Sequence, residues 1–198
     1  HGYLILRETL DRKMLNELDS ELTRIARSDN HLKPVREGFD MEPDQSTADE
    51  LPVFRKIGGI TDCSDSFARL MRHPRIVEVL HRLCPEDIHL FRDVVMMKPA
   101  RVGREKPWHQ DSLYWSYQPM ELVSAMTALD DAAPENGCLQ IVPGSHKKAM
   151  QHSGRELRFE LNEEQQQQTR YVPLKAGDTL LFHSLLWHAS EPNRTDNE

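Results

Sequence analysis

The chain has 198 residues, 38% of them hydrophobic, which is enough for one domain with a substantial core. The formal net charge is −7, and the sequence contains neither a basic stripe for nucleic acid nor an apolar run of membrane-spanning length. Three scattered cysteines without CxxC spacing predict reduced thiols. We therefore expect a cytoplasmic protein with no nucleic-acid or membrane partner.

The first part of the chain is predicted to be mainly helical. A short apolar strand over 2–6 precedes a helix that begins near Thr9 or Asp11 and ends at about Ser28, with leucines at helical spacing on one face. Residues 29–53 are polar and rich in proline, which predicts a loop. Long loops in compact domains often bind ligands, so this loop is a candidate for substrate contact.

The pattern changes after a second helical stretch. That stretch begins at Ser64 or Asp65, runs through Met71 and restarts at Pro74, a residue suited to the first turn of a helix. Segments with strand character then follow at short intervals, at 88–97, 108–113, 122–129, 139–142, 171–173 and 179–182. Helices followed by a series of short strands predict an α+β fold with helices packed outside a β part that is either a sandwich or a double-stranded β-helix core (a cupin-like jelly roll). A nucleotide-binding doubly wound fold is disfavoured, because strand–helix–strand alternation, GxGxxG and a P-loop are all absent from the sequence.

The stretch Trp108-His109-Gln110-Asp111 carries the first indication of chemistry. On an extended strand His109 and Asp111 would point to the same face, because successive side chains alternate. They would then supply two thirds of a 2-His-1-carboxylate triad, which holds Fe(II) and leaves coordination positions open. A lone His-x-Asp is weak support in a chain with ten histidines. The segment 180–193 offers a third ligand, and spacing alone leaves His183 and His188 as alternatives.

Several further motifs surround these residues in a fixed order. They are Lys98-Pro99, Trp108-His-Gln-Asp111, Asn136-Gly-Cys-Leu139, Val142-Pro-Gly-Ser-His146, Gly177-Asp178, and Phe182-His-Ser-Leu-Leu-Trp-His188-Ala-Ser190 with Asn193. In this order they resemble the phytanoyl-CoA dioxygenase family of Fe(II)/2-oxoglutarate-dependent oxygenases. The resemblance is strongest from Lys98 to Asn193, about half of the chain, and the N-terminal strand and helix also fit it.

The resemblance implies that His109, Asp111 and His188 are the iron ligands. It also implies that Ser190 helps to hold the carboxylate of 2-oxoglutarate, although turn capping is an equal alternative. Lys98 is expected either to add positive charge beside the cosubstrate or to be an ordinary lysine at a strand end.

The resemblance also bears on the extent of the domain. In relatives an arginine about eleven residues after the distal histidine binds the carboxylate of 2-oxoglutarate, and here that position would lie one beyond Glu198. We therefore expect residues 1–198 to be a single dioxygenase domain that is truncated at both ends.

The activity that the resemblance implies is hydroxylation of an unactivated C–H bond in a small organic substrate. Fe(II), 2-oxoglutarate and O2 would be required, and succinate and CO2 would be released. Asp111 favours hydroxylation, because family halogenases have a small residue in its place. Four aromatic residues near the motifs are expected to line a substrate pocket or to belong to the core, namely Tyr114, Trp115, Tyr117 and Trp187. Two alternatives remain open: a catalytically silent relative that binds metal or ligand, and a cupin-like metalloenzyme that needs no 2-oxoglutarate.

Overall fold

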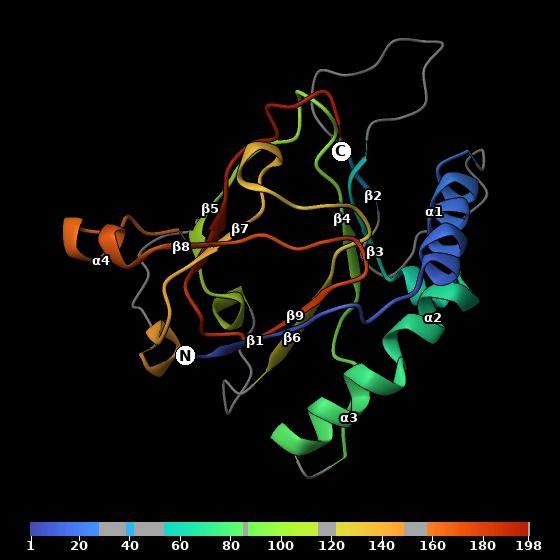
Figure 1. Cartoon of the computed structure of the whole chain (residues 1–198), viewed down its shortest axis with the longest axis horizontal. Coiled ribbons are helices and arrows are strands. Elements are labelled where there is room, and N and C mark those ends of the chain that lie inside the picture. The colour runs from blue at the N-terminus through green and yellow to red at the C-terminus, as the bar shows by residue number, and fades with distance from the viewer. Residues whose placement is uncertain (28–38, 42–53, 85–86, 115–121, 149–157, 198) are drawn as a thin grey trace.

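The computed structural model describes residues 1–27, 39–41, 54–84, 87–114, 122–148 and 158–197. Helices α1 (Arg12–Arg27), α2 (Asp65–Met71) and α3 (Pro74–Leu83) lie together on one side of the strands, and the short α4 (Glu163–Gln168) lies on the opposite side (Figure 1). Among the described helices, none has both the length and the apolar character that crossing a bilayer would require.

The strands form three antiparallel sheets. The first has the order β1-β9-β6, the second β5-β10-β7-β8 and the third β2-β3-β4. The strand bounds are β1 (Tyr3–Leu6), β2 (Phe39–Met41), β3 (Phe54–Gly58), β4 (Val94–Met96), β5 (Lys106–His109), β6 (Val123–Thr127), β7 (Leu139–Ile141), β8 (Arg170–Val172), β9 (Thr179–His183) and β10 (His188–Ser190).

Strand β9 joins the two main parts of the core. Leu180 and Phe182 pack with Ile141 of β7 in a cluster shared by the first and second sheets. Leu181, between them in sequence, packs instead in the cluster that contains the buried residues of α1 and α2, such as Leu18. Because neighbouring side chains of a strand point to opposite faces, β9 packs against the second sheet on one face and against the helices on the other.

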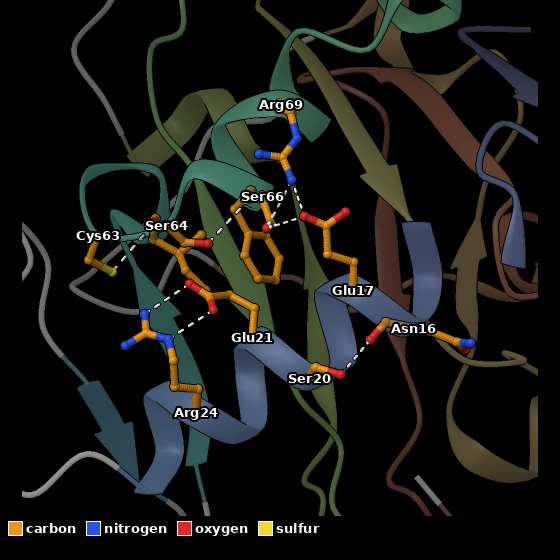
Figure 2. Close-up of polar contacts among 11 residues, drawn as sticks. Asn16, Glu17, Ser20, Glu21, Arg24, Cys63, Ser64, Ser66 and Arg69 are labelled. Atoms are coloured by element: carbon orange, nitrogen blue, oxygen red, sulfur yellow. Dashed lines mark hydrogen bonds and ion pairs between the residues drawn. The ribbon is translucent and has the colours of Figure 1, made fainter. Parts of the chain in front are cut away.

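Helices α1 and α2 are also linked by polar contacts at their exposed edge (Figure 2). The carboxylate of Glu17 on α1 accepts a hydrogen bond of 2.8 Å from the hydroxyl of Ser66 and a second one from the guanidinium of Arg69. Leu18, the next residue of α1, is fully buried. The apolar contact is therefore expected to dominate the stability of this interface, since exposed ion pairs contribute little.

The fold agrees with the sequence in its helices and differs in several of the strand segments. The predicted loop over 29–53 contains β2, and its other residues lie outside the described part. The strand predicted over 88–97 is limited to β4, and Leu90 and Phe91 before it are exposed, at 57% and 47%. The strand β3 was not predicted from the sequence, because its partners β2 and β4 are distant in the chain and pairing depends on that contact.

Asp178 anchors the turn before β9 to the end of β1. Its side chain is 3% exposed and accepts hydrogen bonds from the backbone N–H groups of Glu8 and Lys175, both at 2.9 Å, and from Arg7 at 2.6 Å. Burial by itself raises the pKa of this carboxyl, but the two backbone hydrogen bonds and Arg7 outweigh burial and lower the pKa below its usual value. Asp178 is therefore held as a buried, fully hydrogen-bonded carboxylate.

Leu18→Ala is expected to lower the free energy of unfolding by about 3 kcal/mol, because it removes a buried side chain and leaves a cavity between α1 and the sheets. Urea denaturation monitored by circular dichroism measures this. Glu17→Gln, next to it but exposed, is the matched control and should leave the melting temperature nearly unchanged. A loss below about 1 kcal/mol for Leu18→Ala would contradict this account of the helix interface.

Asp178→Asn is expected to lower the free energy of unfolding at pH 7 by about 2 kcal/mol, because an amide cannot accept all of the hydrogen bonds that the carboxylate accepts. Because the folded pKa is depressed, the stabilisation by Asp178 is present above the unfolded pKa of about 3.9 and is lost as the pH falls through the folded pKa. The difference between the two proteins should therefore shrink from pH 7 to pH 3. An equal difference in urea unfolding at both pH values would show that ionised Asp178 is not what stabilises the turn.

Candidate metal centre

Pairing of two short strands brings two histidines together. β10 lies between β5 and β7, and in the β5–β10 register His188 is directly opposite His109. The two residues are 4% and 5% exposed, and their ring centroids are 4.0 Å apart. One antiparallel strand contact thus joins the Trp108–Asp111 motif to the motif that contains His188.

Asp111 lies on a turn that brings its carboxylate next to the two histidines. The strand predicted over 108–113 ends at His109, and a 3-10 turn, η2, spans Asp111–Tyr114. The prediction that strand alternation places His109 and Asp111 on one face is therefore wrong in its local geometry. Because of this turn the carboxylate still lies beside the histidines. Asp111 Oδ1 is 3.6 Å from Nε2 of His109 and 3.5 Å from Nε2 of His188.

Buried polar residues on both sides of Asp111 hold this turn. Ser112 N donates to Ser184 O at 3.1 Å, and the hydroxyls of these two serines are also hydrogen-bonded. The amide of Gln110 donates to the carbonyl oxygens of Lys148 and Leu185, at 3.0 and 2.5 Å. Gln110 and Ser112 are fully buried, so these bonds satisfy groups that water does not reach. Neither residue was given a role from the sequence. The one sequence feature that could have pointed to Gln110 is its position between two candidate ligands.

Backbone carbonyls determine which nitrogen each histidine presents. Nδ1 of His109 lies 2.8 Å from Pro107 O, and Nδ1 of His188 lies 2.8 Å from Leu186 O. A carbonyl oxygen can only accept, so each Nδ1 carries the proton and each Nε2 keeps its lone pair. Both lone pairs are then available beside Asp111 Oδ1, as metal ligation requires.

The electrostatics of the cluster favour a neutral imidazole at His109 beside an ionised carboxylate at Asp111. Burial, followed by the proximity of His188, lowers the pKa of His109 to about 3. For Asp111 burial acts to raise the pKa, but the interactions with His188 and His109 and the hydrogen bond from Ser124 outweigh it and lower the pKa to about 2. Ser124 Oγ donates to Asp111 Oδ2 at 2.9 Å. Ser124 was also missed by sequence reasoning, because nothing in its own segment indicates that it meets the motif.

These three side chains fit a divalent metal ion. One donor atom from each of His109, Asp111 and His188 lies within 4.8 Å of the others, and this is the only such group in the part of the chain that is described. Two imidazoles and one carboxylate are the donor set typical of non-haem Fe(II) sites with open positions.

Three other candidate residues lie near this cluster and have different surroundings. His183 is outside it, and its Nδ1 accepts a hydrogen bond from Leu185 N at 3.1 Å. Ser190 is buried two residues after His188 on β10, and its hydroxyl makes no hydrogen bond to the described residues. The ammonium of Lys98 donates to Arg104 O at 2.8 Å and to Glu191 O. Lys98 therefore joins backbone segments, which favours the strand-end alternative over contact with a cosubstrate.

The aromatic candidates divide into two kinds. Tyr114 is 43% exposed, its ring meets His109 edge-on at a centroid distance of 5.8 Å, and its hydroxyl accepts a hydrogen bond from Lys106 at 3.0 Å. Trp187 is buried against Phe159 and belongs to the core. Trp115 and Tyr117 lie outside the described residues. An open groove of about 1250 Å³ between α1 and the α2–α3 segment is lined by none of the three candidate ligands.

Comparisons with known proteins identify relatives of this chain. The mouse peroxisomal phytanoyl-CoA dioxygenase is 28% identical over 213 residues, which cover 98% of this chain and 62% of the mouse protein. The L-proline trans-4-hydroxylase of Streptomyces griseoviridis is 29% identical over 157 residues, or 77% of this chain and 52% of that protein. The chain thus spans less than two thirds of the length of these relatives.

A solved structure extends the comparison to the fold. The epimerase SnoN, in a complex described with Fe3+, alpha ketoglutarate and nogalamycin RO, superposes with a TM-score of 0.77 at 24% identity, over 98% of this chain and 74% of that one. This likeness confirms the predicted jelly roll with helices outside. The family model described as phytanoyl-CoA dioxygenase (PhyH) matches residues 1–198, the whole of the sequence. The family resemblance of the motifs is thereby confirmed, and the chain belongs to the phytanoyl-CoA dioxygenase family.

Proposed function

We propose that this protein is an Fe(II)- and 2-oxoglutarate-dependent dioxygenase that hydroxylates an unactivated C–H bond of a small organic substrate and releases succinate and CO2. The observation that carries the proposal is the convergence of His109, Asp111 and His188 on one point between two buried imidazoles. Family membership supports it, as do relatives named for phytanoyl-CoA oxygenation and proline hydroxylation.

Nε2 of His109, Oδ1 of Asp111 and Nε2 of His188 would hold the iron. When bound, the iron with 2-oxoglutarate and O2 supplies the oxidising chemistry, while the protein supplies binding and orientation. The carbonyls of Pro107 and Leu186 keep both imidazoles in the ligating tautomer and orientation. Burial of both rings limits the access of water to the site.

Ser190 is our proposed contact for the cosubstrate. It is buried on the strand of His188, and residues two apart on a strand face the same way. Its hydroxyl is not used by the described residues, so it is available to a carboxylate. We assign no such contact to Lys98, whose ammonium is engaged by two carbonyl oxygens.

We also propose that residues 1–198 belong to a single domain in a reducing compartment, the cytoplasm. The sheets and helices share β9 across both main core clusters, which supports one folding unit. Cys63, Cys84 and Cys138 are free, and burial raises the pKa of the Cys138 thiol to about 11. Thiols of this kind are typical of reducing compartments.

Aerobic incubation of the protein with Fe(II), ascorbate and 2-oxoglutarate is expected to form succinate even without the physiological substrate, through uncoupled turnover. His109→Ala and Asp111→Ala should lower succinate formation by at least about 100-fold, because each removes a ligand. His81→Ala, a change of an exposed histidine on α3, is the control and should have no effect. Iron binding without succinate from the wild-type protein would instead favour the catalytically silent alternative, and succinate from both ligand variants would refute the proposed site.

A further inference from the structure

Ser124 makes a contact that the ligand set alone does not explain. It lies on β6, opposite Phe182 of β9 in the first sheet, whereas Asp111 follows β5 of the second sheet. Its hydroxyl donates to Asp111 Oδ2 at 2.9 Å. The bond therefore joins the two sheets at the carboxylate of the proposed metal site.

The direction of Ser124 follows from its strand. Met126, two residues further on, packs in the core cluster shared by the first and second sheets, and Val123 packs in the helix-side cluster. By alternation Ser124 faces the second sheet, as Met126 does. A small polar side chain at this position leaves space for the η2 turn and provides a donor to it.

The bond distinguishes the two oxygens of Asp111. Oδ1 faces Nε2 of both histidines, at 3.6 and 3.5 Å. Oδ2 accepts from Ser124, the only hydrogen bond that the described residues make to that oxygen. The terminal torsion of an aspartate is soft, so the carboxylate plane rotates easily unless a partner holds one oxygen. Ser124 supplies that restraint at Oδ2, whereas the histidines lie near Oδ1.

We propose that Ser124 is a positioning residue, which holds Oδ2 of Asp111 so that Oδ1 is presented, already oriented, to the metal. The inference rests on the proposed function for the identity of the site, and adds that a residue outside every recognised motif sets its metal affinity. Without the hydroxyl the carboxylate would have to be ordered during metal binding, and this ordering would weaken the binding. Partners that orient ligating carboxylates typically change metal affinity by about 10- to 100-fold.

The test is a titration of the metal-free protein with Co(II) alone, without 2-oxoglutarate, followed by visible absorption. Ser124→Ala is expected to raise the dissociation constant by about 10-fold or more. Ser124→Thr keeps a hydroxyl on a strand-compatible side chain and should bind within about threefold of wild type. The control is Ser66→Ala, which removes a serine-to-carboxylate hydrogen bond of 2.8 Å at α2 (Figure 2). Helix α2 and strand β5 lie on different sides of the molecule (Figure 1). Ser66→Ala should leave Co(II) affinity unchanged.

Melting temperatures of the metal-free variants are measured in parallel, and Ser124→Ala is expected to stay close to wild type. Equal Co(II) affinity for Ser124→Ala and wild type would overturn the inference while leaving the triad intact. Weakened binding in Ser124→Ala that Ser124→Thr does not restore would also overturn it. If His188→Ala bound Co(II) as tightly as wild type, the proposed site itself would fail, and the role of Ser124 would fail with it.

Discussion

The antiparallel contact between β5 and β10 is the constraint on which the site depends. It sets His109 opposite His188 with both rings buried and 4.0 Å apart. Two buried imidazoles in contact are unfavourable if both are charged, and burial together with the proximity of His188 lowers the pKa of His109. The carbonyls of Pro107 and Leu186 then select the tautomer, which leaves two lone pairs beside one carboxylate oxygen. A cluster of this kind is far better suited to binding a cation than to forming ordinary core packing.

The rest of the fold supports this contact at some energetic cost. Gln110, Ser112 and Ser184 are fully buried polar residues, and each must be hydrogen-bonded to offset the loss of water. Their bonds run from the β5–η2 segment to the segment between β9 and β10. Apolar side chains would have filled the same volume at a lower desolvation cost. The buried polar residues instead hold the η2 turn, and therefore Asp111, in one position.

Local signals in the sequence were sufficient for much of the fold. Ser64 and Pro74 mark the starts of α2 and α3, and Asn136-Gly137 marks a turn in which Gly137 has a φ of +83°. The order of the motifs identified the family, because each motif has its own place along the jelly roll. Spacing did not distinguish His183 from His188, and only the family pattern favoured His188. The structure gives a physical reason for that choice, since β9, which contains His183, belongs to the other sheet.

What the sequence did not predict depends on contacts between distant segments. The η2 turn, which begins at Asp111, is held by a hydrogen bond to Ser184, and Ser124 donates a hydrogen bond to Asp111 from a different sheet. The pairing of β3 with β2 and β4 is of the same kind. No local pattern contains these partners, so they emerge only from the packed chain.

An anaerobic titration with Fe(II) and then 2-oxoglutarate, followed by visible absorption, tests whether the three ligands form one iron site. We expect a metal-to-ligand charge-transfer band in the wild-type protein, its retention in His183→Ala and its loss in His188→Ala. Such a result would show that the strand contact assembles an iron site that chelates the keto acid. A well-folded wild-type protein without the band, or a band that persists in His188→Ala, would contradict the account.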